Sequence, residues 1–223
     1  MSTSEDRLAV PLASGIVDVT VATDEADDAG AVLVLAHGAG AGMRHPFLAG
    51  LAGAVARSGV TVIRFNFPYV EAGRRMPGRP ADAVATWRAL AAHASGLGLP
   101  VWAAGKSYGG RMASMAAAEG DFPVRGLAYL GYPLHTPGRP EKPRAEHLPE
   151  IAQPQLFVEG DLDPFIQPLS QFTDVVATCR NAAVAWIEGG NHSFEVKGRR
   201  RSADVIGADL APILTGFIDA SAG

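Results

Sequence analysis

Short runs of consecutive apolar residues alternate along this chain with stretches whose apolar residues recur at helical spacing. The continuous runs are typical of strands that are buried on both faces of a parallel sheet. Residues 31–36 form such a run, and residues 124–130 are also of the buried type. Further strands are predicted at residues 60–67, 99–104, 155–159 and 182–187. Helices are predicted at residues 46–58, 81–95, 110–118, 168–179 and 202–220. This alternation predicts an α/β protein with a doubly wound, mostly parallel sheet flanked by helices.

The start of the chain and one later connection have a different pattern. Residues 1–13 are expected to form a loosely ordered lead-in, and residues 15–21 alternate as an edge strand does. Residues 131–149 hold five prolines, which predicts a loop with room for one short helical turn rather than a large helical lid. With 223 residues, 48% of them hydrophobic, the chain is expected to form one domain spanning residues 1–223.

The sequence Gly-Lys-Ser-Tyr-Gly at residues 105–109 stands between a predicted strand and a predicted helix. Its glycines suit a turn so tight that the serine backbone is strained and the hydroxyl is pushed out above the sheet edge. The alternative is a serine that only caps the helix. The flanking strand and helix favour a nucleophile at Ser107. Lys106 has no part in that chemistry and is expected to be structural or exposed at the rim.

The sequence His-Gly-Ala-Gly-Ala-Gly at residues 37–42 follows the first buried strand. Its alternating glycines let backbone N–H groups turn toward a small anion. A phosphate-binding loop would need a Lys-Ser/Thr pair after it, but Met-Arg-His follows, and the dinucleotide fingerprint is also absent. An oxyanion hole remains, with the N–H of Ala39 as a donor and that of Gly40 as second choice. His37 is expected to shape the loop rather than act as a base.

An acid and a base are predicted on two later loops. Asp163, before a proline at the exit of a sharp turn, is favoured over Asp161, which is expected to cap that turn. His192 follows the last predicted strand. Because the carboxyl ends of parallel strands meet at one sheet edge, Ser107, Asp163 and His192 are expected to come within hydrogen-bond reach.

These motifs together resemble the α/β-hydrolase superfamily, in a short lidless form similar to dienelactone hydrolases. The resemblance covers nearly the whole chain and rests on the serine turn, the His-Gly-x-Gly loop, the Gly-x-x-Asp-Pro turn and the Gly-x-x-His turn. Residues 64–69, 105–111 and 131–135 look closer still to bacterial relatives of an animal testis-expressed, hydrolase-like protein. Dienelactone hydrolases use a cysteine where this chain has Ser107, so their lactone is not carried over. The serine instead resembles the esterase, lipase and thioesterase branches.

The predicted chemistry is acyl transfer to water. His192 takes the Ser107 proton during attack, and Asp163 fixes the histidine tautomer and stabilises its charged form. The backbone N–H groups of Tyr108 and Ala39 are expected to hold the negative oxygen of each tetrahedral intermediate.

Three further residues, Gly40, Tyr69 and Tyr132, are candidates for binding the substrate, a small ester or thioester. For Tyr69 and the arginines of the Arg74–Arg79 stretch, a solvated loop is favoured over ligand binding.

Two other functions stay open. A non-catalytic hydrolase-fold module could bind a partner through the Arg199–Arg201 stretch or the proline-rich loops. The same three residues could instead transfer an acyl group to an alcohol or cleave an amide, since the acceptor depends on pocket shape and water access.

Charge and cysteine content limit the binding partners and the cellular compartment that we expect. The net charge is −4 and the one dense basic run, residues 197–201, has no interleaved aromatic residue, so nucleic-acid binding is not expected. Cys179 is the only cysteine, which excludes an internal disulfide. No stretch reads as a signal or membrane span, and no metal-ligand spacing occurs. We expect a cytoplasmic enzyme with no metal and no organic cofactor; its oligomeric state is left open.

Overall fold

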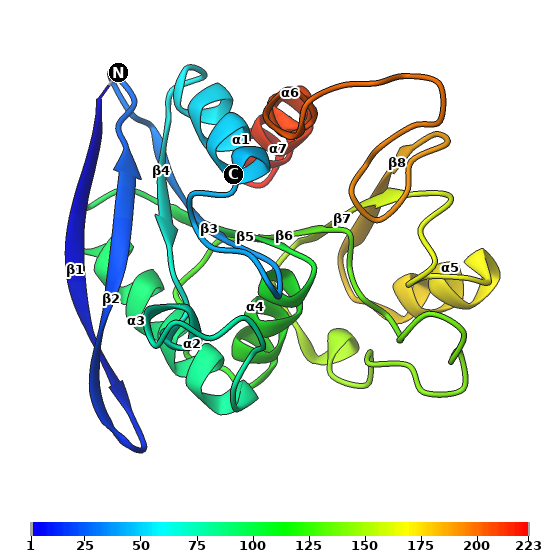
Figure 1. The fold of residues 1–223 in the computed structure, drawn as a ribbon, viewed down its shortest axis with the longest axis horizontal. Helices are drawn as coiled ribbons and strands as arrows, with labels where there is room; N and C mark the ends of the chain where they lie inside the picture. Colours follow the sequence, from blue (N-terminus) through cyan, green and yellow to red (C-terminus); the bar gives the residue numbers. More distant parts are fainter. Residues whose placement is uncertain (1, 223) are drawn as a thin grey trace.

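The computed structural model describes residues 2–222, and its centre is one eight-stranded sheet with the order β1-β2-β4-β3-β5-β6-β7-β8 (Figure 1). Strands β3 to β8 run parallel to one another, whereas β1 and β2 pair antiparallel with their neighbours. The strands are β1 (Thr3–Leu12), β2 (Gly15–Asp24), β3 (Ala31–Ala36), β4 (Val60–Phe65), β5 (Val101–Lys106), β6 (Leu127–Leu130), β7 (Gln155–Gly160) and β8 (Ala182–Ile187). The predicted mostly parallel sheet is confirmed.

Helices cover both faces of this sheet (Figure 1). They are α1 (Pro46–Ala56), α2 (Pro68–Glu71), α3 (Pro80–Ser95), α4 (Tyr108–Ala118), α5 (Leu169–Thr178), α6 (Ala203–Asp209) and α7 (Ala211–Ala220), with one 3-10 turn, η1 (Leu148–Glu150). One hydrophobic cluster joins the sheet to α1, α6 and α7, and a second joins it to α3, α4 and α5. This two-layer covering explains why every residue of β3 and β4 is buried.

The last predicted helix is wrong in one respect, because residues 202–220 form two helices. The break falls at Leu210, which ends α6 and precedes α7. Pro212 follows it, and a proline ring has no N–H and collides with the carbonyl four residues earlier, so a continuous helix cannot pass this position. The predicted loop at residues 131–149 is confirmed, since its only regular segment is the 3-10 turn that begins at Leu148.

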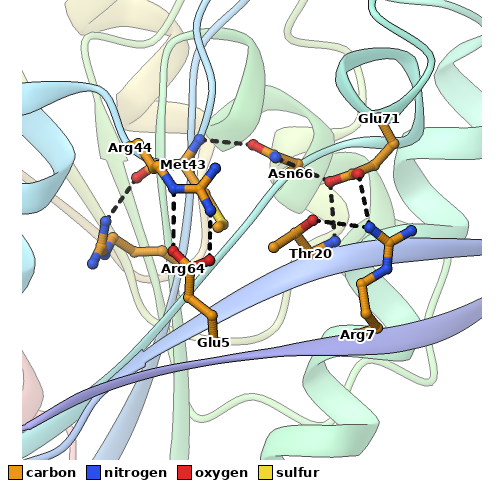
Figure 2. Close-up of polar contacts among 8 residues, drawn as sticks. All are labelled: Glu5, Arg7, Thr20, Met43, Arg44, Arg64, Asn66 and Glu71. Atoms are coloured by element: carbon orange, nitrogen blue, oxygen red, sulfur yellow. Dashed lines mark hydrogen bonds and ion pairs between the residues drawn. The ribbon is translucent and has the colours of Figure 1, made fainter.

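The expected loose lead-in at residues 1–13 is also wrong. Thr3–Leu12 forms the edge strand β1, which pairs along its whole length with β2, so the segment predicted as the edge lies one strand further in. Glu71 of α2 fastens this hairpin: it accepts hydrogen bonds from the Thr20 N–H and the Asn66 amide, each 3.0 Å long, and pairs with Arg7 (Figure 2). The strand escaped prediction because most of its side chains are exposed and no apolar face marks it.

Candidate active site

Ser107 occupies a sharp turn between β5 and α4, with φ 49° and ψ −113°. A non-glycine residue with positive φ is strained, and such strain is held only where the surroundings impose it. Two glycines impose it here by permitting close approach. A Cβ on Gly105 would lie 2.3 Å from the N of Gly110, and one on Gly109 would lie 2.5 Å from the carbonyl oxygen of His37. Only glycine fits at either position.

Three side chains from separate loops meet at the carboxyl edge of the sheet. His192 Nε2 lies 2.9 Å from Ser107 Oγ, and its Nδ1 lies 2.6 Å from Asp163 Oδ2. The serine follows β5, the aspartate follows β7 and the histidine follows β8. Since a carboxylate only accepts hydrogen bonds, Nδ1 carries the proton and Nε2 is free to accept from the serine hydroxyl.

The surroundings of His192 keep its ring neutral and fixed. Burial lowers its pKa below 6.5, the nearby charge of Lys106 acts in the same direction, and the hydrogen bond to Asp163 opposes both. Phe165 stacks on the imidazole with ring centroids 4.2 Å apart. The Phe165 N–H donates to Asp163 Oδ1 at 2.8 Å, so one short segment orients both partners of the pair.

A buried acid and a partly buried lysine lie next to that pair. Glu159 is fully buried, and its Oε1 accepts the Tyr132 N–H at 2.6 Å. Burial and the nearby charge of Asp163 raise its pKa well above the ordinary value. Burial lowers the pKa of Lys106 to about 8, and the lysine lies over the Phe194 ring, 5.4 Å from its centroid. The lysine is therefore not exposed at the rim; it contributes a charge beneath the site.

The loop at residues 37–42 is anchored by buried hydrogen bonds at its start. His37 is fully buried, and burial lowers its pKa to about 4, so the ring is neutral at ordinary pH. Its Nε2 accepts the Phe67 N–H at 3.1 Å, and its Nδ1 donates to the carbonyl of Gly38 at 2.8 Å. The Tyr69 hydroxyl donates to the same carbonyl at 3.4 Å. Both side-chain nitrogens of His37 are thus used to shape the loop.

The far end of this loop is tied to the amino-terminal hairpin. Asn66 Oδ1 accepts the N–H of Met43 at 2.9 Å, and Arg64 Nη1 donates to the Met43 carbonyl at 2.8 Å (Figure 2). Arg64 in turn forms a two-point ion pair with Asp24 of β2, at 2.7 and 3.1 Å. Both side chains of this pair are buried.

Two backbone N–H groups stand close to the serine. Tyr108 is the first residue of α4, so its N–H has no partner within the helix. The N–H of Ala39 makes no hydrogen bond to another described residue. The loop touches the serine turn: a Cβ on Gly38 would lie 3.7 Å from Ser107 Cβ. Gly40 has φ 75° and makes the turn that follows.

A cavity of about 590 Å³ opens over the serine. Ser107, His192, Ala39 and Tyr108 line it, together with apolar side chains of α1 and α6, Phe47 and Ile206 among them. Gly40, Tyr69 and Tyr132 are not among its lining residues.

Tyr69 and Tyr132 lie behind the cavity wall. Tyr69 is 7% exposed on the short helix α2, which corrects the expectation of a solvated loop at this position. The Tyr132 hydroxyl donates to the carbonyl of Arg144 at 2.8 Å. Each tyrosine therefore holds the backbone of a loop.

Asp161 makes a separate contact: its Oδ1 accepts the Gly189 N–H at 2.7 Å and so joins the loops after β7 and β8. Of the basic run at residues 197–201, Arg201 pairs with Asp209 and the remaining side chains are exposed. No helix in residues 2–222 has the length and apolar character needed to cross a membrane, and no three potential metal ligands cluster there.

The family model of the alpha/beta hydrolase domain matches residues 29–211. The chain belongs to this family. The matched segment begins before β3 and ends at the start of α7, so it contains all three loops that meet at Ser107.

Solved structures with this hydrolase fold cover nearly the whole chain. A lidless α/β serine hydrolase from Xanthomonas campestris is 22% identical, with a TM-score of 0.73 over 99% of this chain and 96% of that one. A dienelactone hydrolase from Anabaena variabilis is 17% identical, with a TM-score of 0.73 over 99% of both chains. The esterase domain of a Rhodothermus marinus protein is 15% identical, with a TM-score of 0.74 over 100% of both chains. The lidless α/β-hydrolase fold is thereby confirmed.

Three residues near the site of this hydrolase were not identified from sequence as parts of it: Phe165, Glu159 and the partly buried Lys106. Glu159 did carry a signal, since a charged residue within an apolar strand run is unusual unless it has a partner. Phe165 carried none, because its stacking on His192 joins two loops that are distant in the sequence.

Proposed function

We propose that this α/β hydrolase is a serine hydrolase that cleaves a small carboxylic ester or thioester through an acyl-enzyme. The observation that carries the proposal is the unbroken hydrogen-bond chain from Asp163 through His192 to Ser107 at the floor of the cavity. Family membership supports a hydrolase, and the fold shared with esterases and serine hydrolases is consistent with it.

In the proposed reaction, Ser107 Oγ attacks the ester carbonyl carbon while His192 Nε2 takes the hydroxyl proton. The carbonyl oxygen becomes negative and is held by the N–H groups of Tyr108 and Ala39, each contributing about 3 kcal/mol to the transition state. The histidine then gives its proton to the leaving alcohol, and the acyl group stays on the serine. Water, deprotonated by the same histidine, attacks the acyl-enzyme, which releases the acid and restores the serine.

The chemistry of the surroundings supports these roles. A neutral histidine is required for the first proton transfer, and burial favours the neutral ring of His192. Asp163 is fully buried, so its charge acts on the imidazolium with little screening by water. Acyl transfer to an alcohol and amide cleavage use the same three residues and remain alternative reactions. The relationship to bacterial relatives of the testis-expressed, hydrolase-like protein stays a separate proposal.

A burst assay with short-chain p-nitrophenyl esters tests the proposal, combined with labelling by a fluorophosphonate read by mass spectrometry. We expect a burst and a label at Ser107 in the wild type and neither in Ser107→Ala. Ser58→Ala is the matched control, because Ser58 is exposed at the amino end of β4, on the opposite edge of the sheet. A folded wild type that takes no label at Ser107 would refute the mechanism and favour a partner-binding module.

An alcohol added to the same assay separates hydrolysis from acyl transfer. Hydrolysis predicts that the acid remains the main product when methanol is present at low concentration. A new ester as the main product would instead identify an acyltransferase.

A further inference from the structure

Two arginines line the cavity over Ser107 without any acidic partner. Arg111 comes from α4, and Arg144 comes from the loop after β6. The Arg111 guanidinium makes no hydrogen bond or ion pair with another described residue, and its Nε is buried. The Arg144 guanidinium donates only to the hydroxyl of Thr136, at 2.9 Å. Arg111 is partly buried and Arg144 is exposed at the cavity mouth. A partly buried arginine normally has a carboxylate partner, so an unpaired Arg111 is unusual.

The two charges act on each other. Arg111 is partly buried, and its burial together with the charge of Arg144 lowers its pKa. Two like charges at one wall raise the free energy of the empty cavity, and an anion between them would remove that repulsion. Tyr108 also lines the cavity; its hydroxyl is buried without a hydrogen-bond partner, and its ring packs against Phe67 and Tyr69.

The other charged groups of the cavity do not neutralise the positive charges of Arg111 and Arg144. Lys106 faces the acids Asp163 and Glu159, which raise its pKa against the effect of burial. The one acid among the lining residues is Glu195; its Oε2 accepts the Asn191 amide at 3.0 Å, and it forms no ion pair with either arginine. The guanidinium groups therefore have no neutralising partner in the lining.

The backbone fixes where both arginines stand. The Arg111 N–H donates to the carbonyl of Ser107 at 3.0 Å, so its side chain leaves α4 one turn after the serine. Arg144 is held from two sides: its carbonyl accepts the Tyr132 hydroxyl, and its N–H donates to the carbonyl of Leu134 at 2.6 Å. An anionic group bound there would share the cavity with an ester carbonyl at Ser107.

We propose that Arg111 and Arg144 form a carboxylate-binding subsite, and that the substrate of this hydrolase is a short ester bearing a carboxylate a few bonds from the scissile carbonyl. The planar guanidinium presents paired donors that match the two oxygens of a carboxylate. The inference rests on the proposed function, since it specifies the substrate class of that site. Which side of the ester carries the anion is left to the experiment.

Two pairs of esters of matched shape test the subsite. Monoethyl succinate and ethyl succinamate differ only in a carboxylate on the acyl side, and acetoxyacetate and acetoxyacetamide differ likewise on the alcohol side. We expect kcat/KM to favour the charged member of one pair by about 10- to 100-fold, as for charge-assisted hydrogen bonds. Arg111→Gln and Arg144→Gln should each reduce that preference at least fivefold. Arg139→Gln, an exposed arginine of the same loop that does not line the cavity, should leave it unchanged.

Labelling of Ser107 by the fluorophosphonate separates the two proposals. If the wild type and all variants are labelled but neither ester pair shows a charge preference, the subsite is refuted and the serine mechanism stands. If the wild type is not labelled, the mechanism itself fails.

If none of the four esters is turned over, the subsite is tested by whether a dicarboxylate protects Ser107 from fluorophosphonate labelling. Millimolar succinate is expected to slow labelling of the wild type but not of Arg111→Gln, and succinamide should protect neither. Equal labelling rates with and without succinate would overturn the inference.

Discussion

Replacing Asp24 with asparagine tests whether the amino-terminal hairpin supports the loop beside Ser107. Asp24 and Arg64 form a two-point ion pair whose side chains are only 6% and 8% exposed. Asparagine keeps the shape but removes the charge, so the Arg64 guanidinium is left charged in a buried position. Breaking a buried pair in this way costs about 3–5 kcal/mol of unfolding free energy.

The exposed ion pair between Glu5 and Arg44 in the same region is the matched control. Its side chains are 43% and 66% exposed, so Glu5→Gln should cost about 0–1 kcal/mol. Urea unfolding followed by circular dichroism measures both variants. A cost below 1 kcal/mol for Asp24→Asn, indistinguishable from that of Glu5→Gln, would refute the assignment of a buried, stabilising pair.

The same variant also tests the link to the site. Arg64 holds the carbonyl of Met43 at the end of the loop that carries Ala39, so a displaced Arg64 should loosen the proposed oxyanion donor. We expect Asp24→Asn to slow fluorophosphonate labelling of Ser107 without urea, while Glu5→Gln labels at the wild-type rate. A destabilised variant with an unchanged labelling rate would show that the hairpin stabilises the fold without affecting the loop.

Three further predictions concern the base, its neighbouring charge and the serine turn. Burial lowers the pKa of His192, so the neutral ring persists to a lower pH than in a free imidazole. The acid limb of the kcat/KM profile should therefore have its midpoint below pH 6.5. A midpoint above pH 7 would contradict this. The charge of Lys106 contributes to that lowering, so Lys106→Met should move the midpoint to higher pH, and an unchanged midpoint would argue against the interaction. Gly105→Ala places a Cβ 2.3 Å from the N of Gly110 and should lower the unfolding free energy by about 3 kcal/mol or more. Gly216→Ala in α7 has no atom within 4 Å of the new Cβ and should raise the unfolding free energy by up to about 1 kcal/mol. Equal Tm values for the two variants would refute the steric argument.

The parallel strands were predictable because their signal is local. The inner strands are covered on both faces by helices, so an uninterrupted apolar run such as that of β3 is enough to indicate a strand of this kind. The sheet order then places the loops after β5, β7 and β8 at one edge, and that is why Ser107, Asp163 and His192 could be grouped before their contacts were known.

Features that depend on distant partners could not be predicted. β1 has no apolar face, and its place in the sheet depends on pairing with β2 and on Glu71, far away in the sequence. The burial of Lys106 has the same origin: nothing in the sequence around it indicates that its neighbours Asp163 and Glu159 come from the far end of β7.

The two tyrosines illustrate what convergence at a sheet edge does and does not determine. Tyr69 and Tyr132 follow β4 and β6, so topology brings both close to the serine, and on that ground they were predicted to bind substrate. Topology leaves open whether a side chain faces the cavity or the core, and here the core prevails because an aromatic ring gains more free energy when it is buried. Each hydroxyl then needs an acceptor and takes a loop carbonyl, that of Gly38 or that of Arg144. The loops that line the cavity are therefore held from behind by the residues expected to line it.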